Sequence, residues 1–229
     1  MPNIVTRQDW NAARLDLLAE EKAFQKARDA LSARRRTLPW VAVTDDYEFQ
    51  STHGPLNLRD LFGDHSQLIV QHFMFGDDWD AGCASCSLWA DTFNGTTAHL
   101  AARDTAFVSV STASLDQIEA YKARMGWDFD WVSCAGSRFN HDYGVTFDGA
   151  GGQYNYRPKQ GDMKELPGIS VFVCEGASVY HTYSTYSRGL DNMNSTYQYL
   201  DLTPKGRDEA ELPWPMAWVR RHDSYGDMS

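Results

Sequence analysis

A chain of 229 residues with 42% hydrophobic and 13% aromatic residues can bury one substantial core, and this composition excludes a disordered protein. Its formal net charge of −10 argues against binding nucleic acid through a phosphate-neutralising surface. No apolar run approaches the roughly 20 residues that span a bilayer, and residues 1–10 lack the apolar core of a signal peptide. We therefore expect a cytoplasmic protein with no nucleic-acid or membrane partner.

A long helix is the first predicted element. Residues from about Thr6 to Arg36 are rich in Ala, Leu, Glu, Lys and Arg and contain no Gly or Pro, with Thr6 or Asp9 as the N-cap and Pro39 beyond the end. Its apolar residues are sparse, which leaves two arrangements open: packing on the outside of its own domain, or formation of a homodimer. These residues are Trp10, Leu17, Leu18, Phe24 and Leu31.

The middle of the chain, residues 39–203, alternates strand-like and helix-like segments. A capping-box pattern, Ser114 followed three residues later by Gln117, marks one helix start, and residues 175–176 separate two strands at hairpin spacing. This order implies an α/β fold, a mixed sheet with helices on both faces. The predicted segments are a short helix 59–62, strand 68–75, a helix through about residue 102, strand 106–111, helix 114–125, strand 127–133, strands 169–174 and 177–183, and helix 188–200.

Two cysteines separated by two residues, Cys83 and Cys86, follow the predicted strand 68–75 and a Gly/Asp-rich turn, and precede a predicted helix. Thiols three residues apart at a helix start lie on one face, and the unpaired backbone N–H groups there stabilise a thiolate at the first position. A thiolate attacks in disulfide exchange, and a second cysteine within reach resolves the mixed disulfide. We therefore predict a redox dithiol in which Cys83 attacks and Cys86 resolves.

The cysteine pair has two other interpretations, half of a metal site or an inert pair. A structural zinc site needs four ligands, and the chain has no second CxxC and no HxxxH pair. The remaining cysteines, Cys134 and Cys174, adjoin apolar stretches, which indicates buried thiols rather than ligands. The open alternative is a copper(I)-binding module that holds a soft ion with the pair and His181 or His72, since thiolate and imidazole suit that ion.

The order of elements around the CxxC resembles the thioredoxin superfamily, and several phrases of the sequence narrow the resemblance. Tyr47-Glu48-Phe49, Leu58-Arg59-Asp60-Leu61-Phe62-Gly63 and Asp142-Tyr143-Gly144-Val145 look like its peroxiredoxin-type branch. Others are similar to the DUF899 family of predicted thioredoxin-like dithiol oxidoreductases, over almost the whole chain. These are Ala19-Glu20-Glu21-Lys22-Ala23-Phe24, Leu38-Pro39-Trp40-Val41, Gln71-His72-Phe73-Met74-Phe75-Gly76, Cys86-Ser87-Leu88-Trp89-Ala90-Asp91 and His181-Thr182-Tyr183-Ser184-Thr185-Tyr186.

Departures from better-understood relatives limit the expected reaction. Thioredoxins place Trp before the first cysteine and Gly-Pro between the two, whereas this chain has Gly82 before and Ala84-Ser85 between, so efficient reduction of general protein disulfides is not expected. Peroxiredoxins place Thr three residues before the peroxidatic cysteine. Here Asp80 lies three residues before Cys83, and Cys83 lies three residues before Cys86. Neither position holds Thr, which argues against peroxidase activity.

Histidines supply two further candidate residues. The resemblance places His72 near the buried carboxylate that accepts the resolving thiol's proton in thioredoxins, and neutral imidazole suits that task. On alternation, however, His72 shares a strand face with Leu68 and Val70, so a hydrogen-bonded core histidine is the alternative. His181 lies in the second hairpin strand, which in this fold borders the central strand near the motif.

Substrate-binding candidates complete the predicted site. The aromatic surroundings of the motif, including Trp79 and Trp89, favour a small or specific thiol substrate over many protein substrates. Thioredoxin-like domains usually carry a cis-proline facing the CxxC, and the resemblance assigns that role to Pro167. We therefore predict a thiol-disulfide oxidoreductase without a cofactor, acting on a small-molecule or protein thiol or disulfide.

The C-terminal stretch, residues 204–229, has little helical periodicity but keeps large apolar groups. A disordered tail would rarely carry so many, so we expect residues 212–219 to form an extended arm packed on the domain or a partner subunit, with Arg220, Arg221 and Asp223 at its solvated edge. The predicted organisation is thus a helical extension (1–38), a thioredoxin-like domain (39–203) and this arm.

Overall fold

The computed structural model describes residues 3–149 and 151–226 of the chain. The chain divides into two compact units, Met1–Pro39 and Trp40–Ser229, and the second contains the sheet and both cysteines of the CxxC. Within the described ranges, no helix is both long enough and apolar enough to cross a membrane.

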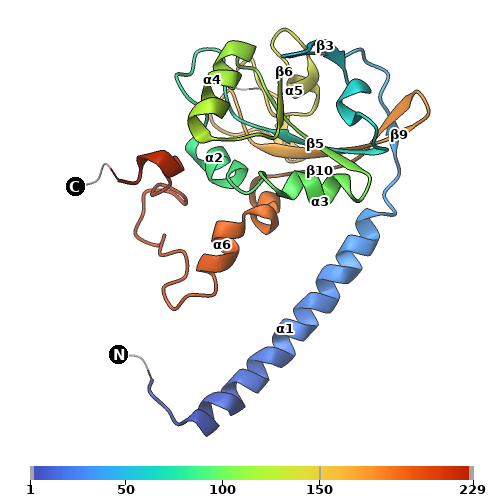
Figure 1. Cartoon of the computed structure of the whole chain (residues 1–229). Coiled ribbons are helices and arrows are strands. Elements are labelled where there is room, and N and C mark those ends of the chain that lie inside the picture. Colours follow the sequence, from blue (N-terminus) through green and yellow to red (C-terminus); the bar gives the residue numbers. More distant parts are fainter. Residues whose placement is uncertain (1–2, 150, 227–229) are drawn as a thin grey trace. The chain divides into compact units, whose positions relative to one another are not determined.

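The first unit is built around helix α1 (Arg7–Arg35, Figure 1). Thr6 caps its start, where the side-chain oxygen accepts a hydrogen bond from the Asp9 backbone N–H at 3.2 Å. Arg34 and Arg35 lie in the last turn, where positive charge interacts favourably with the helix C-terminus. The predicted long helix is therefore confirmed.

In the described part of the second unit, eight strands form one mixed sheet in the order β1-β10-β9-β4-β5-β6-β2-β3. Strands β4, β5 and β6 are parallel neighbours, and the other pairs are antiparallel. With helices packed beside it, the sheet confirms the predicted fold class (Figure 1). The strands are β1 (Val41–Ala42), β2 (Glu48–Ser51), β3 (Gly54–Asn57), β4 (Gln67–His72), β5 (Thr105–Ser111), β6 (Asp130–Ser133), β9 (Gly168–Glu175) and β10 (Ser178–Tyr186).

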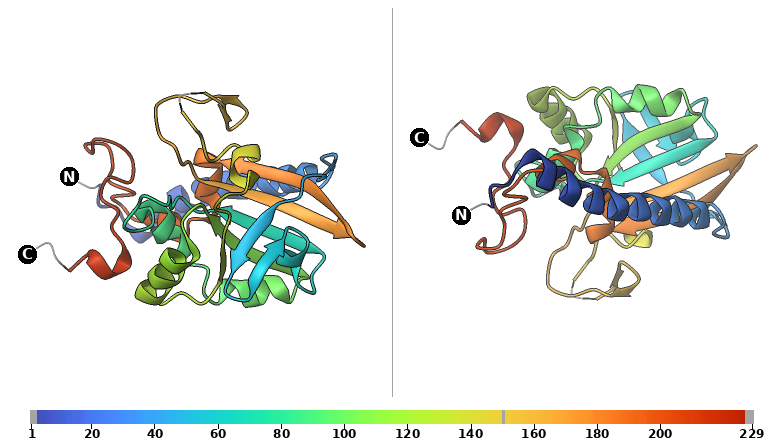
Figure 2. Two further views of the ribbon diagram at one scale, coloured as in Figure 1. Left: turned by 90° about the horizontal axis from the view of Figure 1, so that it is seen from above. Right: turned by 90° about the horizontal axis from the view of Figure 1, so that it is seen from below.

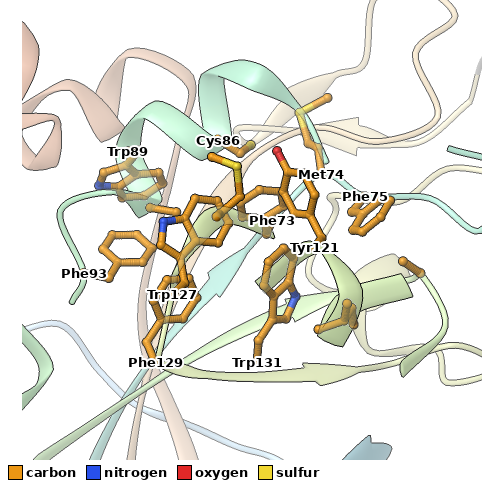
Figure 3. Close-up of a cluster of buried hydrophobic side chains, with 14 of the residues drawn as sticks. Phe73, Met74, Phe75, Cys86, Trp89, Phe93, Tyr121, Trp127, Phe129 and Trp131 are labelled. Atoms are coloured by element: carbon orange, nitrogen blue, oxygen red, sulfur yellow. The ribbon is translucent and has the colours of Figure 1, made fainter. Parts of the chain in front are cut away.

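The two faces of the sheet carry separate apolar clusters, because successive side chains of a strand point to opposite sides. On β4, Ile69 packs against one cluster, whereas Leu68 and Val70 belong to the other. We call the first the motif-side core, since it includes Cys86, and the second the far-side core. Figure 3 shows the labelled part of the motif-side core, which consists of Phe73, Met74, Phe75, Cys86, Trp89, Phe93, Tyr121, Trp127, Phe129 and Trp131.

The helices follow their sequence signals with one interruption. Helix α4 (Leu115–Met125) has the predicted capping box, in which Ser114 and Gln117 bond each other's backbone N–H groups. The helix predicted after the CxxC is instead two, α2 (Ala84–Ala90) and α3 (Thr96–Ala101). Gly95 lies between them at φ +80°, a left-handed conformation that interrupts the helix and favours glycine.

The strand predicted at 68–75 ends earlier, at His72. The chain beyond it stays attached to the sheet edge, because Phe73 N–H donates to the Val110 carbonyl at 2.9 Å and the Phe75 carbonyl accepts from Ala113 N–H at 2.8 Å. Other elements that hold the fold are the 3-10 helix η1 (Asp60–Phe62), helix α5 (Phe139–Asp142) and the small sheet of β7 (Gln153–Tyr154) and β8 (Arg157–Pro158), which projects from the main sheet (Figure 2).

The last part of the chain contains less regular structure than predicted. The helix expected at 188–200 is a 3-10 helix, η2 (Ser187–Met193), followed by α6 (Ser195–Leu200). In place of an extended arm, residues 201–219 form successive turns, and a short 3-10 helix, η3 (His222–Ser224), follows. Val219 is buried there at 4% exposure, whereas Trp214 is 64% exposed.

His72 belongs to a buried polar network on the far side of the sheet. Its Nδ1 lies 2.9 Å from Asn140 Oδ1, and its Nε2 lies 2.8 Å from Ser170 Oγ. Ser184 Oγ links Ser170, at 2.8 Å, to His181 Nε2, at 2.7 Å. Neutral His72 satisfies both partners by donating at Nδ1 and accepting at Nε2, so the network stabilises the uncharged imidazole.

We predict that the free energy of unfolding falls with pH below about 6.5, because the unfolded chain then takes up a proton at His72 while the folded chain does not. Burial lowers the pKa of His72 from 6.5 to about 4. The unfolded chain therefore binds a proton more readily, so the contribution is complete above about pH 6.5 and is lost as pH falls toward about 4. The loss of unfolding free energy amounts to roughly 2 kcal/mol at pH 5.

Urea unfolding of wild type and His72→Gln at pH 7.5 and pH 5, experimental settings on either side of about pH 6.5, measures this contribution. Titrations shared by both chains cancel in the difference between their free energies, and glutamine keeps one donor and one acceptor. The difference in free energy of unfolding between wild type and His72→Gln should become smaller at the lower pH. A difference that does not change with pH would show that His72 is not held neutral.

Candidate active site

The CxxC lies at the start of α2, next to the chain that leaves β4. Cys83 is the N-cap residue and Cys86 lies one turn inside the helix. The Cys83 backbone N–H donates to the Met74 carbonyl at 3.0 Å, which ties the motif to the sheet edge. Gly82 permits this close approach, because a Cβ there would lie 2.7 Å from the Phe73 ring and 2.8 Å from the Tyr121 ring.

The two thiols differ in exposure and in acidity. Cys83 is half-buried and Cys86 is 3% exposed. A hydrogen bond from the Cys86 thiol is the largest cause that lowers the pKa of Cys83, and the backbone N–H groups of Cys86 and Ser85 and the charge of Arg221 act in the same direction against burial. The same hydrogen bond, together with burial, raises the pKa of Cys86. The arrangement therefore favours a thiolate at Cys83 and a protonated thiol at Cys86.

The chain's other cysteines lack these features. Burial raises the pKa of Cys134 to about 12. The Cys174 sulfur lies 3.6 Å from the His65 carbonyl oxygen, to which its S–H donates. Neither thiol is activated by a neighbouring thiol in the way that Cys83 is.

Arg221 reaches the motif from the C-terminal segment, which lies beside α2 and α4 (Figure 2). Its Nη2 donates to the Gly82 carbonyl at 2.6 Å, and its Nε donates to the Tyr121 hydroxyl at 2.8 Å. Tyr121 and Ser87 hydroxyls lie 2.8 Å apart, and Ser87 Oγ donates to the Cys83 carbonyl at 2.8 Å. The guanidinium thus bonds the Gly82 carbonyl directly and is linked to the Cys83 carbonyl through the Tyr121 and Ser87 hydroxyls.

The expected position of Arg221 at a solvated edge was wrong, because Arg221 is partly buried and donates hydrogen bonds to Gly82 and Tyr121. Two neighbours strengthen the attachment: His222 Nδ1 lies 2.7 Å from Asp91 Oδ1, and Asp223 accepts two hydrogen bonds from Arg124, at 2.7 and 3.1 Å. The charge pattern of residues 220–223 gave no indication of these partners, which lie 99 to 139 positions away in sequence.

A cavity of about 640 Å³ opens over the cysteine pair. The motif and Trp89 form one wall, and η2, α6 and residues 207–216 form the other. Four predicted site residues line it together: Cys83, Cys86, Trp89 and Pro167. Trp79 does not line it, since the Trp79 carbonyl is held by Gln117 Nε2 at 3.2 Å and its side chain packs on the motif-side core.

His72 and His181 are not brought to the cysteine pair. Both lie on the far side of the sheet, where His72 contacts Phe139 and His181 contacts Phe172, whereas Cys86 belongs to the motif-side core. Strand alternation is the physical reason: His72 follows Leu68 and Val70, which face away from α2. The surroundings of His72 match the hydrogen-bonded core histidine considered as the alternative.

The peptide bond before Pro167 is trans, since the described residues contain no cis peptide bond. The cis prediction was therefore wrong, because resemblance alone does not overcome the trans preference of an X–Pro bond. Neighbouring backbone groups are already paired: Leu166 N–H donates to the Val145 carbonyl at 2.8 Å, and the Pro167 carbonyl accepts from the Tyr154 hydroxyl at 2.8 Å.

A buried carboxylate near Cys86 was missed by the sequence analysis. Glu165 is 6% exposed and accepts hydrogen bonds from Thr146, at 3.0 Å, and from Thr112, at 3.2 Å. Burial raises the pKa of Glu165 to about 7, and its charge in turn contributes to the raised pKa of Cys86. Its position in a polar loop segment gave no signal that would have found it.

The alternative metal-binding set, Cys83, Cys86 and His181, is not assembled. In residues 3–149 and 151–226, no three side chains of His, Cys, Asp or Glu gather closely enough to hold a metal ion.

Comparison with known proteins places the sequence in a family. The model of "Bacterial protein of unknown function (DUF899)" matches residues 1–225. The chain belongs to the DUF899 family. No curated protein matches it in sequence.

Several solved structures are similar to this DUF899 member. Peroxidoxin BcpB from Mycobacterium tuberculosis is 15% identical, with a TM-score of 0.50 over 71% of this chain and 97% of its own. Peroxiredoxin Q from Xanthomonas campestris is 13% identical (TM-score 0.45; 70% and 92%), and a putative thiol:disulfide interchange protein DsbE from Chlorobium tepidum is 14% identical (TM-score 0.41; 71% and 95%). The match to the peroxidoxin agrees with the thioredoxin-like fold.

We predict that Arg221→Gln raises the pH at which Cys83 is half-maximally alkylated by about half a unit, because a positive charge beside the thiolate is lost. Mass spectrometry of the Cys83 peptide after iodoacetamide treatment across a pH series measures this. Arg221→Lys keeps the positive charge, so its half-maximal alkylation pH should lie between those of wild type and Arg221→Gln.

Arg220→Gln is the matched control, since Arg220 donates to the Ala217 and Val219 carbonyls rather than to the motif. It should leave the alkylation profile unchanged. Identical profiles for wild type and Arg221→Gln would mean that Arg221 only attaches the C-terminal segment.

Proposed function

We propose that the protein is a dithiol-disulfide oxidoreductase acting on a small thiol or disulfide substrate. The observation that carries the proposal is the position of Cys83 and Cys86 at the start of α2 on the wall of a cavity, with the pKa of the first lowered and that of the second raised. Such a pair separates the attacking from the resolving thiol without a cofactor.

In the reducing direction, the Cys83 thiolate attacks one sulfur of a substrate disulfide RS–SR′. A Cys83–SR bond forms, the substrate S–S bond breaks, and R′S⁻ leaves. Cys86 then loses its proton and attacks the Cys83 sulfur, which closes the Cys83–Cys86 disulfide and releases RS⁻. The substrate gains two electrons, and a low-molecular-weight dithiol reductant must return the protein to the dithiol form. The same steps in reverse oxidise a thiol substrate.

Glu165 is proposed to act on Cys86 through its charge, which contributes to the raised pKa of that thiol. Burial raises the pKa of Glu165 to about 7, so this charge changes near neutral pH. The Thr112 and Thr146 hydroxyls hold its carboxylate in place.

Two features support a small substrate over a protein. The wall of residues 187–216 limits the space above the pair to about 640 Å³, which suits a small molecule. In addition, the Leu166 N–H and the Pro167 carbonyl beside the pair are already hydrogen-bonded within the chain. An extended peptide would find these two backbone groups occupied.

We predict that the reduced protein, treated with a neutral disulfide such as bis(2-hydroxyethyl) disulfide, forms a Cys83–Cys86 disulfide that dithiothreitol reverses. Peptide mapping by mass spectrometry identifies the bond, and turnover with a reductant gives the rate. Cys83→Ser should abolish both, because the attacking thiolate is lost. Cys174→Ser is the control, since this cysteine lies outside the cavity, and it should retain both.

The same assay tests Glu165. In Glu165→Gln the mixed disulfide at Cys83 should close faster at neutral pH, because a negative charge that raises the pKa of Cys86 is removed. The surface variant Glu175→Gln should behave like wild type. Turnover by Cys83→Ser, or a mixed disulfide that never proceeds to the intramolecular bond in wild type, would contradict the proposed function.

A further inference from the structure

Helix α1 carries large apolar side chains at every seventh position. Trp10, Leu17, Phe24 and Leu31 are 48%, 51%, 64% and 48% exposed, and α1 contains no buried residue. A strict seven-residue apolar repeat keeps one seam facing a partner helix when two helices supercoil. We call these four residues the α1 stripe.

The stripe indicates an interaction surface, because α1 contains no buried residue. Most of the stability of a protein helix comes from packing an apolar face, whereas all of the side chains of α1 are at least partly exposed. Isolated exposed apolar residues are ordinary, but these four large ones are aligned on one face along the 29 residues of the helix.

Charge along α1 favours one pairing. Residues 7–21 contain two cations and four carboxylates, whereas residues 22–36 contain six cations and one carboxylate. A parallel pair would bring the two basic halves together, which is unfavourable. An antiparallel pair sets the basic half of each helix beside the acidic half of the other.

The spacing of the stripe fits the antiparallel arrangement in a single register. Trp10 then lies opposite Leu31 of the second copy, and Leu17 lies opposite Phe24 of the second copy. The stripe is symmetric about the midpoint between Glu20 and Glu21. One alignment of the two antiparallel helices therefore brings every stripe residue opposite a stripe residue of the second copy. The helix is thus self-complementary, as a two-fold symmetric interface requires.

We propose that α1 is a self-association surface through which two copies of this chain pair as an antiparallel coiled coil. The proposal rests on the stripe and the charges of α1, not on the chemistry of the cysteine pair. The occupant of the α1 surface is a second copy of the chain. The proposal would hold even if the protein had no redox activity.

Light scattering coupled to size-exclusion chromatography tests the pairing on the full chain. Wild type should have twice the mass of one chain, and Leu17→Asp/Phe24→Asp should have the mass of one chain, because two charges enter the seam. Ala12→Asp/Ala19→Asp is the matched control: it adds the same charges at the same spacing on the opposite face, and it should remain a dimer. Circular dichroism confirms that both variants keep their folded second unit.

Orientation is tested by replacing Phe24 with the photoreactive residue p-benzoylphenylalanine. In the antiparallel pair its cross-link maps to the tryptic peptide 15–22 of the second copy, which contains Leu17. A cross-link to peptide 23–26 would show a parallel pair and overturn the arrangement. A monomeric wild type would overturn the proposal, and a thermal midpoint that falls in Leu17→Asp/Phe24→Asp would then assign the stripe to packing within one chain.

Discussion

The hydrogen bond from the Cys86 thiol to the Cys83 sulfur is the interaction on which the site depends. It stabilises negative charge on the half-buried sulfur and keeps the proton on the buried one, so that attack and resolution are assigned to different residues. This division requires both sulfurs to lie on one face of α2, one turn apart. A small shift of the helix start would remove it.

The rest of the structure holds that helix start in place. The Met74 carbonyl fixes Cys83 to the sheet edge, and the absence of a side chain at Gly82 lets the motif approach the aromatic motif-side core. From the opposite end of the chain, Arg221 adds hydrogen bonds to Gly82 and Tyr121. The C-terminal segment is therefore part of the site, and it also supplies one wall of the cavity.

Features encoded by neighbouring residues could be predicted from the sequence, and features that depend on distant contacts could not. The capping box at Ser114, the long helix α1 and the position of the CxxC at a helix start are local, and the structure has them. Glu165 acts on the motif through its charge and Arg221 through hydrogen bonds, from 79 or more positions away, and no local pattern marks either one. His72 shows the intermediate case, because alternation gave the correct face of β4 but resemblance favoured a role at the other face.

The most direct test is a titration of thiolate absorbance in the reduced protein, compared with Cys86→Ala and Cys86→Ser. We expect one thiolate per chain to form below neutral pH in wild type, and we expect its titration to move to higher pH in Cys86→Ala, which lacks the donor. Cys86→Ser keeps a hydroxyl donor and should retain part of the effect. A wild-type chain without a thiolate at neutral pH, or a Cys86→Ala titration identical to that of wild type, would show that the cysteine pair is not the interaction that organises this site.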